Sequence, residues 1–107
     1  MSTTSDIEAI VHGLMLKHYD GLRKWLRENG LRAPDPFILA KLVADLIRSD
    51  LEGDDQLFDR TVERIADELG LRGKPMRLAH QALYHLMRIA ALAYIKATTS
   101  ASLRRRA

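Results

Sequence analysis

The sequence predicts an all-α fold, a small four-helix domain whose long C-terminal helix is largely apolar. Three observations lead to this prediction. Apolar residues recur at helical spacing in four segments, and residues that cap or break helices bound these segments. No stretch of useful length alternates apolar and polar residues as a strand would, and 107 residues is the length of one domain. We expect residues 1–98 to form that domain and residues 99–107 to form a basic, flexible tail.

The first helix is expected to begin in the stretch SDIE, where Ser5 and Glu8 have the spacing of a capping box. Apolar residues then recur at helical spacing as far as Leu26, and Gly30 supplies the left-handed residue that commonly ends a helix. Asp20 could cap a restart partway along. The pattern therefore predicts an amphipathic helix that is weakened in its middle by glycine.

Capping residues define the next two helices. Asp35 precedes a proline, which is favoured in the first turn of a helix, so the second helix is expected to begin there. It should end in the acidic break DLEGDD, residues 50–55, where Asp54 or Asp55 caps the third helix. Gly70 should end the third helix. The break lacks the spaced oxygens and closing glutamate of a calcium loop, so its acids are assigned to capping and solvation.

The fourth helix is expected to begin near Pro75, to reach about Thr98, and to be a long helix at the centre of the fold. Residues 86–95 are apolar almost all round, which is typical of a helix at the centre of a fold or at an oligomer interface. This pattern leads us to expect a homodimer formed through this helix. The candidate interface residues are Met87, Leu92, Tyr94 and Ile95.

The composition indicates a cytoplasmic protein with no membrane partner. The chain is 47% hydrophobic and 29% charged, which favours a globular domain over a disordered one. It has no cysteine, which excludes disulfides, thiolate metal ligands and a cysteine nucleophile, and fits a reducing compartment. The N-terminus MSTTSDIEA lacks the basic start and apolar core of a signal peptide. Residues 86–95 are too few to cross a bilayer, which takes about 20.

Charge is strongly segregated along the chain. Residues 1–69 contain 9 Lys and Arg and all 14 Asp and Glu, a net charge of −5, whereas residues 70–107 contain 8 Lys and Arg and no acid, a net charge of +8. Such asymmetry suggests an acidic partner such as nucleic acid. The alternative is that the acidic segment from Asp45 to Glu68 packs beside the basic one and neutralises it.

Residues 65–83, IADELGLRGKPMRLAHQAL, resemble a helix-turn-helix, the DNA-binding corner of many bacterial regulators. Ala66 and Gly70 have the spacing of the small residue in the first helix and the glycine at the turn. The resemblance implies that the second helix packs against the first. The residues that would provide this packing are Ile65, Leu69, Leu71, Met76 and Ala79.

The resemblance also implies that the start of the second helix lies in the major groove of DNA. Arginine can bind guanine and glutamine can bind adenine through two hydrogen bonds, while lysine and the helix N-terminus hold phosphates. The candidate nucleic-acid-binding residues are Arg72, Lys74, Arg77, His80 and Gln81, supported by Arg104, Arg105 and Arg106 of the tail. Gly73 and Pro75 indicate a looser turn than the motif uses, and the second helix is long and extensively apolar. An ordinary bundle corner is therefore the alternative.

No other pattern indicates a specific chemistry. The basic residues around Trp25 could bind single-stranded nucleic acid, although Trp25 continues an apolar stripe and is better explained as core. His12 and His18 are six residues apart, and His80 and His85 are five apart, so neither pair has the spacing of a zinc site on one helix face. We find no phosphate loop, nucleophile elbow or catalytic carboxylate pair. We therefore expect no enzymatic activity, no cofactor and no metal.

Two functions fit the sequence. The first is a small nucleic-acid-binding regulatory protein that uses the helix-turn-helix-like corner and the basic C-terminal half. The second is a non-enzymatic helical adaptor or inhibitor that binds a protein complex, for example a phage- or plasmid-type small inhibitor. The position of the basic residues distinguishes them. Outward-facing residues on one surface would favour nucleic acid, and residues paired with the acidic segment 45–68 would favour the adaptor.

Overall fold

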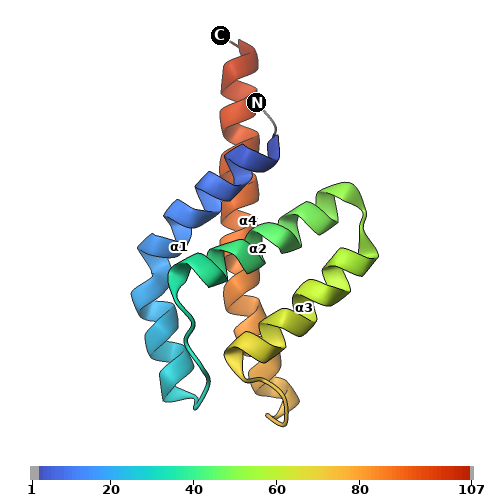
Figure 1. Ribbon diagram of the computed structural model, residues 1–107. Helices are drawn as coiled ribbons and strands as arrows, with labels where there is room; N and C mark the ends of the chain where they lie inside the picture. Colours follow the sequence, from blue (N-terminus) through green and yellow to red (C-terminus); the bar gives the residue numbers. More distant parts are fainter. Residues whose placement is uncertain (1–2, 107) are drawn as a thin grey trace.

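The structure is a computed structural model that describes the backbone of residues 3–106 and the side chains of residues 6–99. It contains four helices in that range and no strand, so the prediction of a small all-α domain is confirmed (Figure 1). The helices are α1 (Thr3–Glu28), α2 (Pro36–Glu52), α3 (Asp55–Leu69) and α4 (Met76–Arg106).

The caps of α2 and α3 are those that local chemistry predicts. The Asp35 carboxylate accepts a hydrogen bond from the backbone N–H of Ile38 at 3.0 Å, and the Asp54 carboxylate accepts one from Leu57 at 3.0 Å. These bonds satisfy N–H groups that the first turn of a helix leaves unpaired. Gly70 ends α3 with a φ of 70°, in the left-handed region. The predicted boundaries of these helices are therefore confirmed.

The N-terminal and C-terminal helices are longer than predicted. Ser5 lies inside α1 rather than at its cap, and α1 continues past Asp20 without a restart. The expected capping box is therefore wrong. A continuous apolar face explains the continuity, because Val11, Met15 and Leu22 are buried, and such packing outweighs the cost of glycine in a helix, about 1 kcal/mol each. At the other end, the backbone of α4 runs past Thr98 to Arg106, through the segment expected to be a tail.

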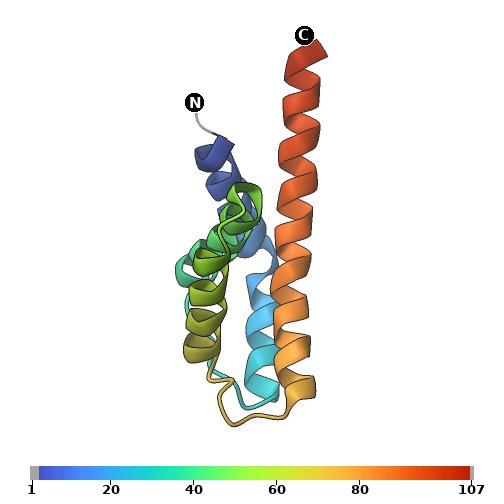
Figure 2. The ribbon, with the colours of Figure 1, turned by 90° about the vertical axis from the view of Figure 1, so that its right-hand side faces the viewer.

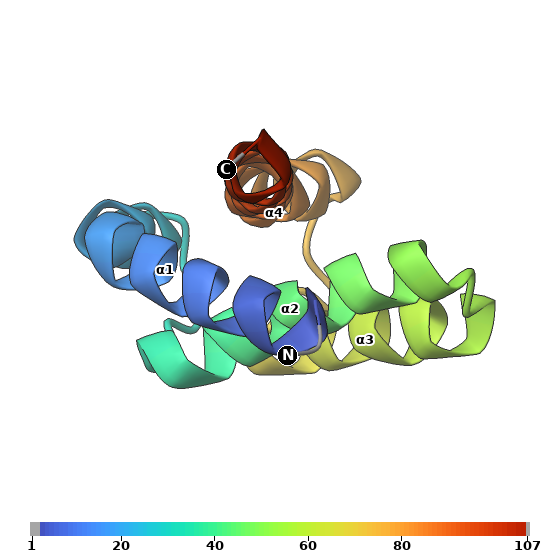
Figure 3. The same ribbon diagram turned by 90° about the horizontal axis from the view of Figure 1, so that it is seen from above.

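The helices form two layers. In Figure 3, α2 and α3 lie side by side in one layer and α4 lies in the other, while α1 begins near α2 and ends near α4. Figure 2 shows α4 standing beside the C-terminal half of α1. Every other helix packs against α2, whereas α3 packs essentially on α2 alone. The central helix is therefore α2, and the expectation that α4 would be central is wrong.

The core lies where α1, α2 and α4 meet. The apolar stripe of α2, residues 39–47, is buried almost continuously. From α4 come two large side chains, Leu86 and Ile89, and three alanines that let the helices approach closely. The loop before α2 is tied to the end of α3 by a hydrogen bond of 2.9 Å from the Arg32 N–H to the Leu69 carbonyl. The buried residues that α4 contributes are Ala82, Leu86, Ile89, Ala90 and Ala93.

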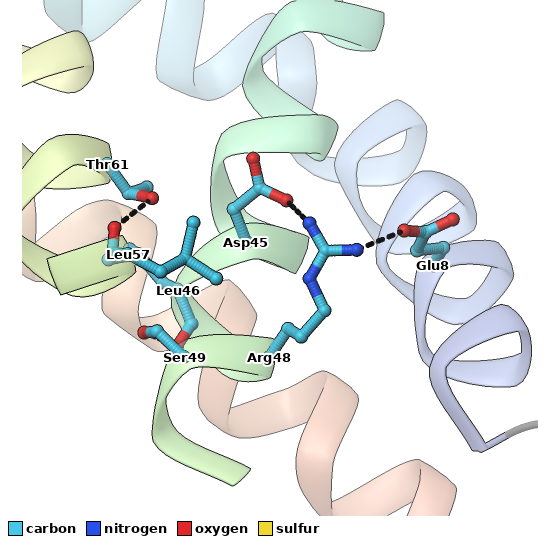
Figure 4. A network of polar contacts seen from close by, with 7 residues as sticks. All are labelled: Glu8, Asp45, Leu46, Arg48, Ser49, Leu57 and Thr61. Carbon is cyan, nitrogen blue, oxygen red and sulfur yellow. Dashed lines mark hydrogen bonds and ion pairs between the residues drawn. The ribbon is translucent and has the colours of Figure 1, made fainter. Parts of the chain in front are cut away.

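One charged group is buried in this core. Asp45 of α2 is only 5% exposed and forms an ion pair with Arg48 one turn further along (Figure 4). Arg48 also lies 3.8 Å from the Glu8 carboxylate of α1, so this guanidinium links the two helices. A buried carboxylate is costly unless it is paired, and Arg48 supplies the pairing. Asp45, the first residue of the acidic segment 45–68, is therefore neutralised by Arg48 within α2 and not by the basic C-terminal half.

Candidate nucleic-acid interface

The described basic residues of the C-terminal half face solvent. Arg72, Lys74, Arg77, Arg88 and Lys96 are all exposed. Among the described residues, one of these five forms an ion pair with the acidic segment: the Arg72 Nε lies 2.6 Å from the Asp67 carboxylate, and both side chains are more than 60% exposed. The hydrogen bond and charge of Asp67 raise the pKa of Arg72. The other four cations have no acidic partner among the described side chains, so most of the basic charge is not neutralised.

The corner between α3 and α4 is open. The helix-turn-helix resemblance implies that its two helices pack together, but α3 packs on α2 and α4 packs on α1 and α2. Ile65, Leu69 and Leu71 are buried as expected. Met76 is 69% exposed, so the expectation that it anchors the second helix is wrong. The connection with Gly73 at a φ of 78° carries the chain from one layer to the other.

The start of α4 instead lies beside the end of α1. The rings of Trp25 on α1 and His85 on α4 have centroids 4.5 Å apart, and the Tyr84 ring follows 6.2 Å from His85. His85 therefore lies next to a ring of each helix, Trp25 on α1 and Tyr84 on α4. Lys74 extends across the same end, because its Nζ lies 3.7 Å from the position that a Cβ of Gly30 would occupy. The contact between α1 and α4 therefore organises this surface.

Two exposed stripes border this contact, and together we call them the basic face. On α4 the stripe has spacings of four, three and four residues, which keep it on one side of a helix. On α1 a stripe with two lysines has the same geometry, and Lys24 makes a loose pair with Glu28 at 4.0 Å. The residues of the basic face are Arg77, Gln81, Tyr84 and Arg88 on α4 and Lys17 and Lys24 on α1, all of them exposed.

A hollow lies between the two stripes, and we call it the basic hollow. Two imidazoles and a guanidinium surround it, and Gly21 leaves it open because nothing lies within 4 Å of the place where its Cβ would be. Burial, and secondly the charge of Arg88, lowers the pKa of His85, so His85 is neutral near pH 7. The residues lining the basic hollow are His18, Gly21, Leu22, His85, Arg88, Ile89 and Leu92.

The residues predicted to bind nucleic acid are only partly brought together. Arg77 and Gln81 lie on the basic face, Lys74 adjoins it at the end of α1, and Arg72 is held by Asp67. His80 is exposed, but it is not part of the stripe. The side chains of Arg104, Arg105 and Arg106 lie outside the described residues, although their backbone is helical.

Sequence reasoning missed Lys17, Tyr84 and Arg88 as members of this surface. The spacing of residues 77, 81, 84 and 88 was a readable signal for the α4 stripe. Lys17 had no such signal, because its neighbourhood depends on which helix packs beside α1.

An acidic stripe occupies the other layer of the molecule. Four carboxylates follow one another at four-residue spacing along the exposed side of α3, which places them along one side of the helix. Figure 3 shows α3 and α4 in different layers. The acidic and basic surfaces are therefore separated, apart from the pair between Arg72 and Asp67. The acidic stripe consists of Asp55, Asp59, Glu63 and Asp67.

A third surface is apolar, and we call it the apolar groove. It lies between α4 and the corner where α2 meets α3. Three of the four predicted dimer residues, Met87, Tyr94 and Ile95, line it, whereas Leu92 lines the basic hollow on the other side of α4. The residues lining the apolar groove are Leu46, Ile47, Asp50, Phe58, Met87, Ala90, Ala91, Tyr94 and Ile95.

Comparison of the chain with models of protein families, with curated proteins and with solved structures finds no match. Within the described part of the chain, none of the helices has the length and hydropathy needed to span a membrane. The described side chains also contain no group of three or more His, Asp and Glu residues placed to hold a metal ion.

Proposed function

We propose that the protein is a small, non-catalytic regulatory protein that binds nucleic acid in the cytoplasm through the basic face. The observation that carries this proposal is the position of three cations, Lys17, Arg77 and Arg88, which are exposed and have no acidic partner among the described residues. Unpaired cations on one surface attract the phosphate backbone, and release of bound counterions drives the association.

The chemistry of the face supports contact with phosphates and with bases. Arg77 and Arg88 lie about 16 Å apart along α4, at 1.5 Å per residue, so they can hold successive parts of one strand. Tyr84 lies between them and is 63% exposed, which offers a ring on which an unpaired base can stack. Gln81 can form hydrogen bonds to a base edge. The helix-turn-helix-like corner contributes Arg77 and Gln81 to this surface, and Lys74 adjoins it.

A charge-matched pair of variants tests the proposal. The variant Arg77→Gln with Arg88→Gln removes two cations from the basic face, and the variant Arg60→Gln with Arg64→Gln removes two exposed cations from α3. Binding of labelled single-stranded DNA, RNA and duplex DNA is measured by fluorescence anisotropy across a salt series. We expect the first variant to bind at least tenfold more weakly and to lower the salt slope by about 2, and the second to bind like the wild type.

Two results would overturn the proposal. One is absence of wild-type binding even at low salt. The other is an equal loss of affinity in both variants, because that would mean that net charge alone, and not the basic face, determines binding.

The second candidate function is an adaptor or inhibitor that binds a protein complex. The acidic stripe on α3 favours it, because regularly spaced carboxylates present a negatively charged surface to a basic protein. The same titrations discriminate between the two functions. An adaptor acting through α3 needs no affinity for nucleic acid, and charge reversal of Asp59 and Glu63 should abolish its binding to the protein complex. The same charge reversal should leave the oligonucleotide affinity of a nucleic-acid binder intact.

A further inference from the structure

The basic hollow has room for a small planar group. Its volume is about 220 Å³, several times the ~30 Å³ that one water molecule occupies in the liquid. It is open on the α1 side because residue 21 is a glycine, and nothing lies within 4 Å of the position of a Cβ there. Size and access therefore allow a ligand group to enter between α1 and α4.

The lining of the hollow combines apolar surface with polar groups. Leu22 and Ile89 are its buried members, and the imidazoles of His18 and His85 and the guanidinium of Arg88 complete it. Among the described side chains, no hydrogen bond uses a ring nitrogen of either histidine. A neutral imidazole offers one donor and one acceptor. An apolar lining with a few such polar groups is typical of a pocket that orients a ring.

We infer that the basic hollow takes one unpaired base of a single-stranded nucleic acid, while the cations around it hold neighbouring phosphates. A nucleobase has two flat apolar faces and an edge of donors and acceptors, which is the combination that the lining accommodates. The inference rests on the proposed function and deepens it, because it names the single strand, and not the duplex, as the form that enters this site.

The surroundings of the hollow fit a strand. Tyr84 is 63% exposed and its ring lies 6.2 Å from that of His85, so a base beside the one in the hollow has a ring on which to stack. Arg88 lines the hollow from α4, and Lys17 is exposed on α1, one residue before the histidine that lines the hollow. Cations on both helices can therefore contact the phosphates of one strand.

The width of the helix pair excludes an intact duplex from the hollow. Figure 2 shows α4 beside the C-terminal half of α1, and the Trp25 and His85 rings meet between them. A helix with its side chains is about 10–12 Å across and packed helices lie about 8–10 Å apart, so the pair is about 20 Å wide. The major groove of DNA is only about 12 Å wide, so paired bases cannot reach a recess between two helices. An unstacked base of a single strand can enter it.

Two glycines of α1 provide a matched pair of variants. Gly21→Leu fills the hollow without changing any charge, and Gly13→Leu makes the same substitution about two turns earlier on the same helix, where the hollow is not lined. Neither glycine has an atom within 4 Å of its Cβ position, and replacing glycine inside a helix favours the helix. Both variants should therefore fold, which circular dichroism checks.

The choice of ligand separates base binding from phosphate binding. Fluorescence anisotropy uses a DNA strand of about ten nucleotides that contains all four bases, its duplex with the complementary strand, and a strand of the same length without bases. Gly21→Leu should bind the first strand at least about fivefold more weakly than the wild type and Gly13→Leu do, because a held base adds to the phosphate contacts. All three proteins should bind the duplex alike and the abasic strand alike. An RNA strand of the same sequence shows whether the hollow takes DNA, RNA or both.

Three results would overturn the inference and leave the proposed binding through the basic face intact. They are equal affinity of Gly21→Leu and Gly13→Leu for both base-containing strands, an abasic strand that binds the wild type as tightly as those strands, and an equal loss for strand and duplex in Gly21→Leu. The second result needs no variant, so it stands even if Gly21→Leu does not fold. Failure of the proposed function is distinct, because the wild type would then bind none of the ligands, and the inference would fall with it.

Discussion

The two long sides of α4 differ in chemistry although the sequence alternates between them almost residue by residue. Arg88 and Leu92 face α1 and line the basic hollow, while Met87 and Ile95 face the α2–α3 corner and line the apolar groove. The sequence pattern of residues 86–95 predicts one apolar segment, but packing divides it into a charged side, a buried side and an exposed apolar side. A helix that is apolar almost all round can therefore present two chemically different surfaces on either side of its buried stripe.

The largest expected effect on stability comes from truncating a residue in the buried stripe that separates the two surfaces. Leu86 is fully buried between them, so Leu86→Ala should lower the free energy of unfolding by about 2–5 kcal/mol through lost burial and a residual cavity. Its neighbour Met87 is 48% exposed, and Met87→Ala should change the monomer's stability by less than about 0.5 kcal/mol. Urea unfolding, at a protein concentration too low for the chain to associate, measures the free energy of unfolding of both variants. Equal effects would contradict the assignment of these two residues to different sides of α4.

A smaller loss of stability is expected from breaking the ion pair that the buried carboxylate of Asp45 makes with Arg48 within α2. Arg48→Met leaves the carboxylate of Asp45 buried without its partner and should lower the free energy of unfolding by about 1–3 kcal/mol. Glu8→Gln is the control, because Glu8 is about half exposed and its 3.8 Å pair with Arg48 should contribute less than about 1 kcal/mol. Both are read from urea unfolding at pH 7. If Glu8→Gln lowers the free energy of unfolding more than Arg48→Met does, the pair between Glu8 and Arg48 contributes more stability than the pair between Asp45 and Arg48.

The two surfaces should also be separable in function by changing adjacent residues. Arg88→Gln removes one phosphate contact, and should weaken nucleic-acid binding severalfold and lower the salt slope by about 1. Met87→Lys changes the apolar side and should leave the affinity for a short oligonucleotide within about twofold of the wild type. Anisotropy titrations of both variants give the comparison. Loss of affinity in both variants would mean that the two sides of α4 act as one site.

Local chemistry predicted the caps at Asp35 and Asp54 and the stop at Gly70, because each depends only on residues within one turn. The packing partners of the helices could not be read in this way. The turn containing Gly73 and Pro75 allows α3 and α4 to pack together or to separate, and only the complementarity of distant faces decides between these arrangements. The structure separates them, which is why Met76 is exposed rather than packed.

The residues of the candidate site divide in the same way, into those that the local sequence predicts and those that depend on how the helices pack. Exposure of Lys74, Arg77 and Gln81 was predictable, since polar residues at the start of a basic helix are seldom buried. The neutralisation of Arg72 was not, because its partner Asp67 lies in the preceding helix and is reached only through the geometry of the turn. The role of Lys17 depends on α1 lying beside α4, a contact between segments about seventy residues apart. Charge counting along the chain identified the basic half correctly but could not identify the helix that completes its surface.

The smallest expected effect is a pH dependence confined to the charged side of α4. Burial, and secondly the positive charge of Arg88, lowers the pKa of His85 below its ordinary value of 6.5 in the folded chain. The unfolded chain therefore takes up this proton first as the pH falls. His85 should contribute stability that is fully present above pH 6.5 and is lost as the pH falls through 6.5 toward the lower folded pKa. An NMR titration of the His85 ring follows this proton directly.

The same titration distinguishes the charged side of α4 from its apolar side. Arg88→Gln should raise the pKa of His85, because it removes a nearby positive charge, and a bound oligonucleotide should raise it as well, because a phosphate near the basic hollow stabilises the imidazolium. Ile95→Lys adds a charge on the apolar side and should leave the His85 titration unchanged. An oligonucleotide that binds without changing the pKa of His85 would place the nucleic-acid contact away from the basic hollow. Tyr84 and Arg77, near the start of α4, would then be the part of the basic face that holds the strand.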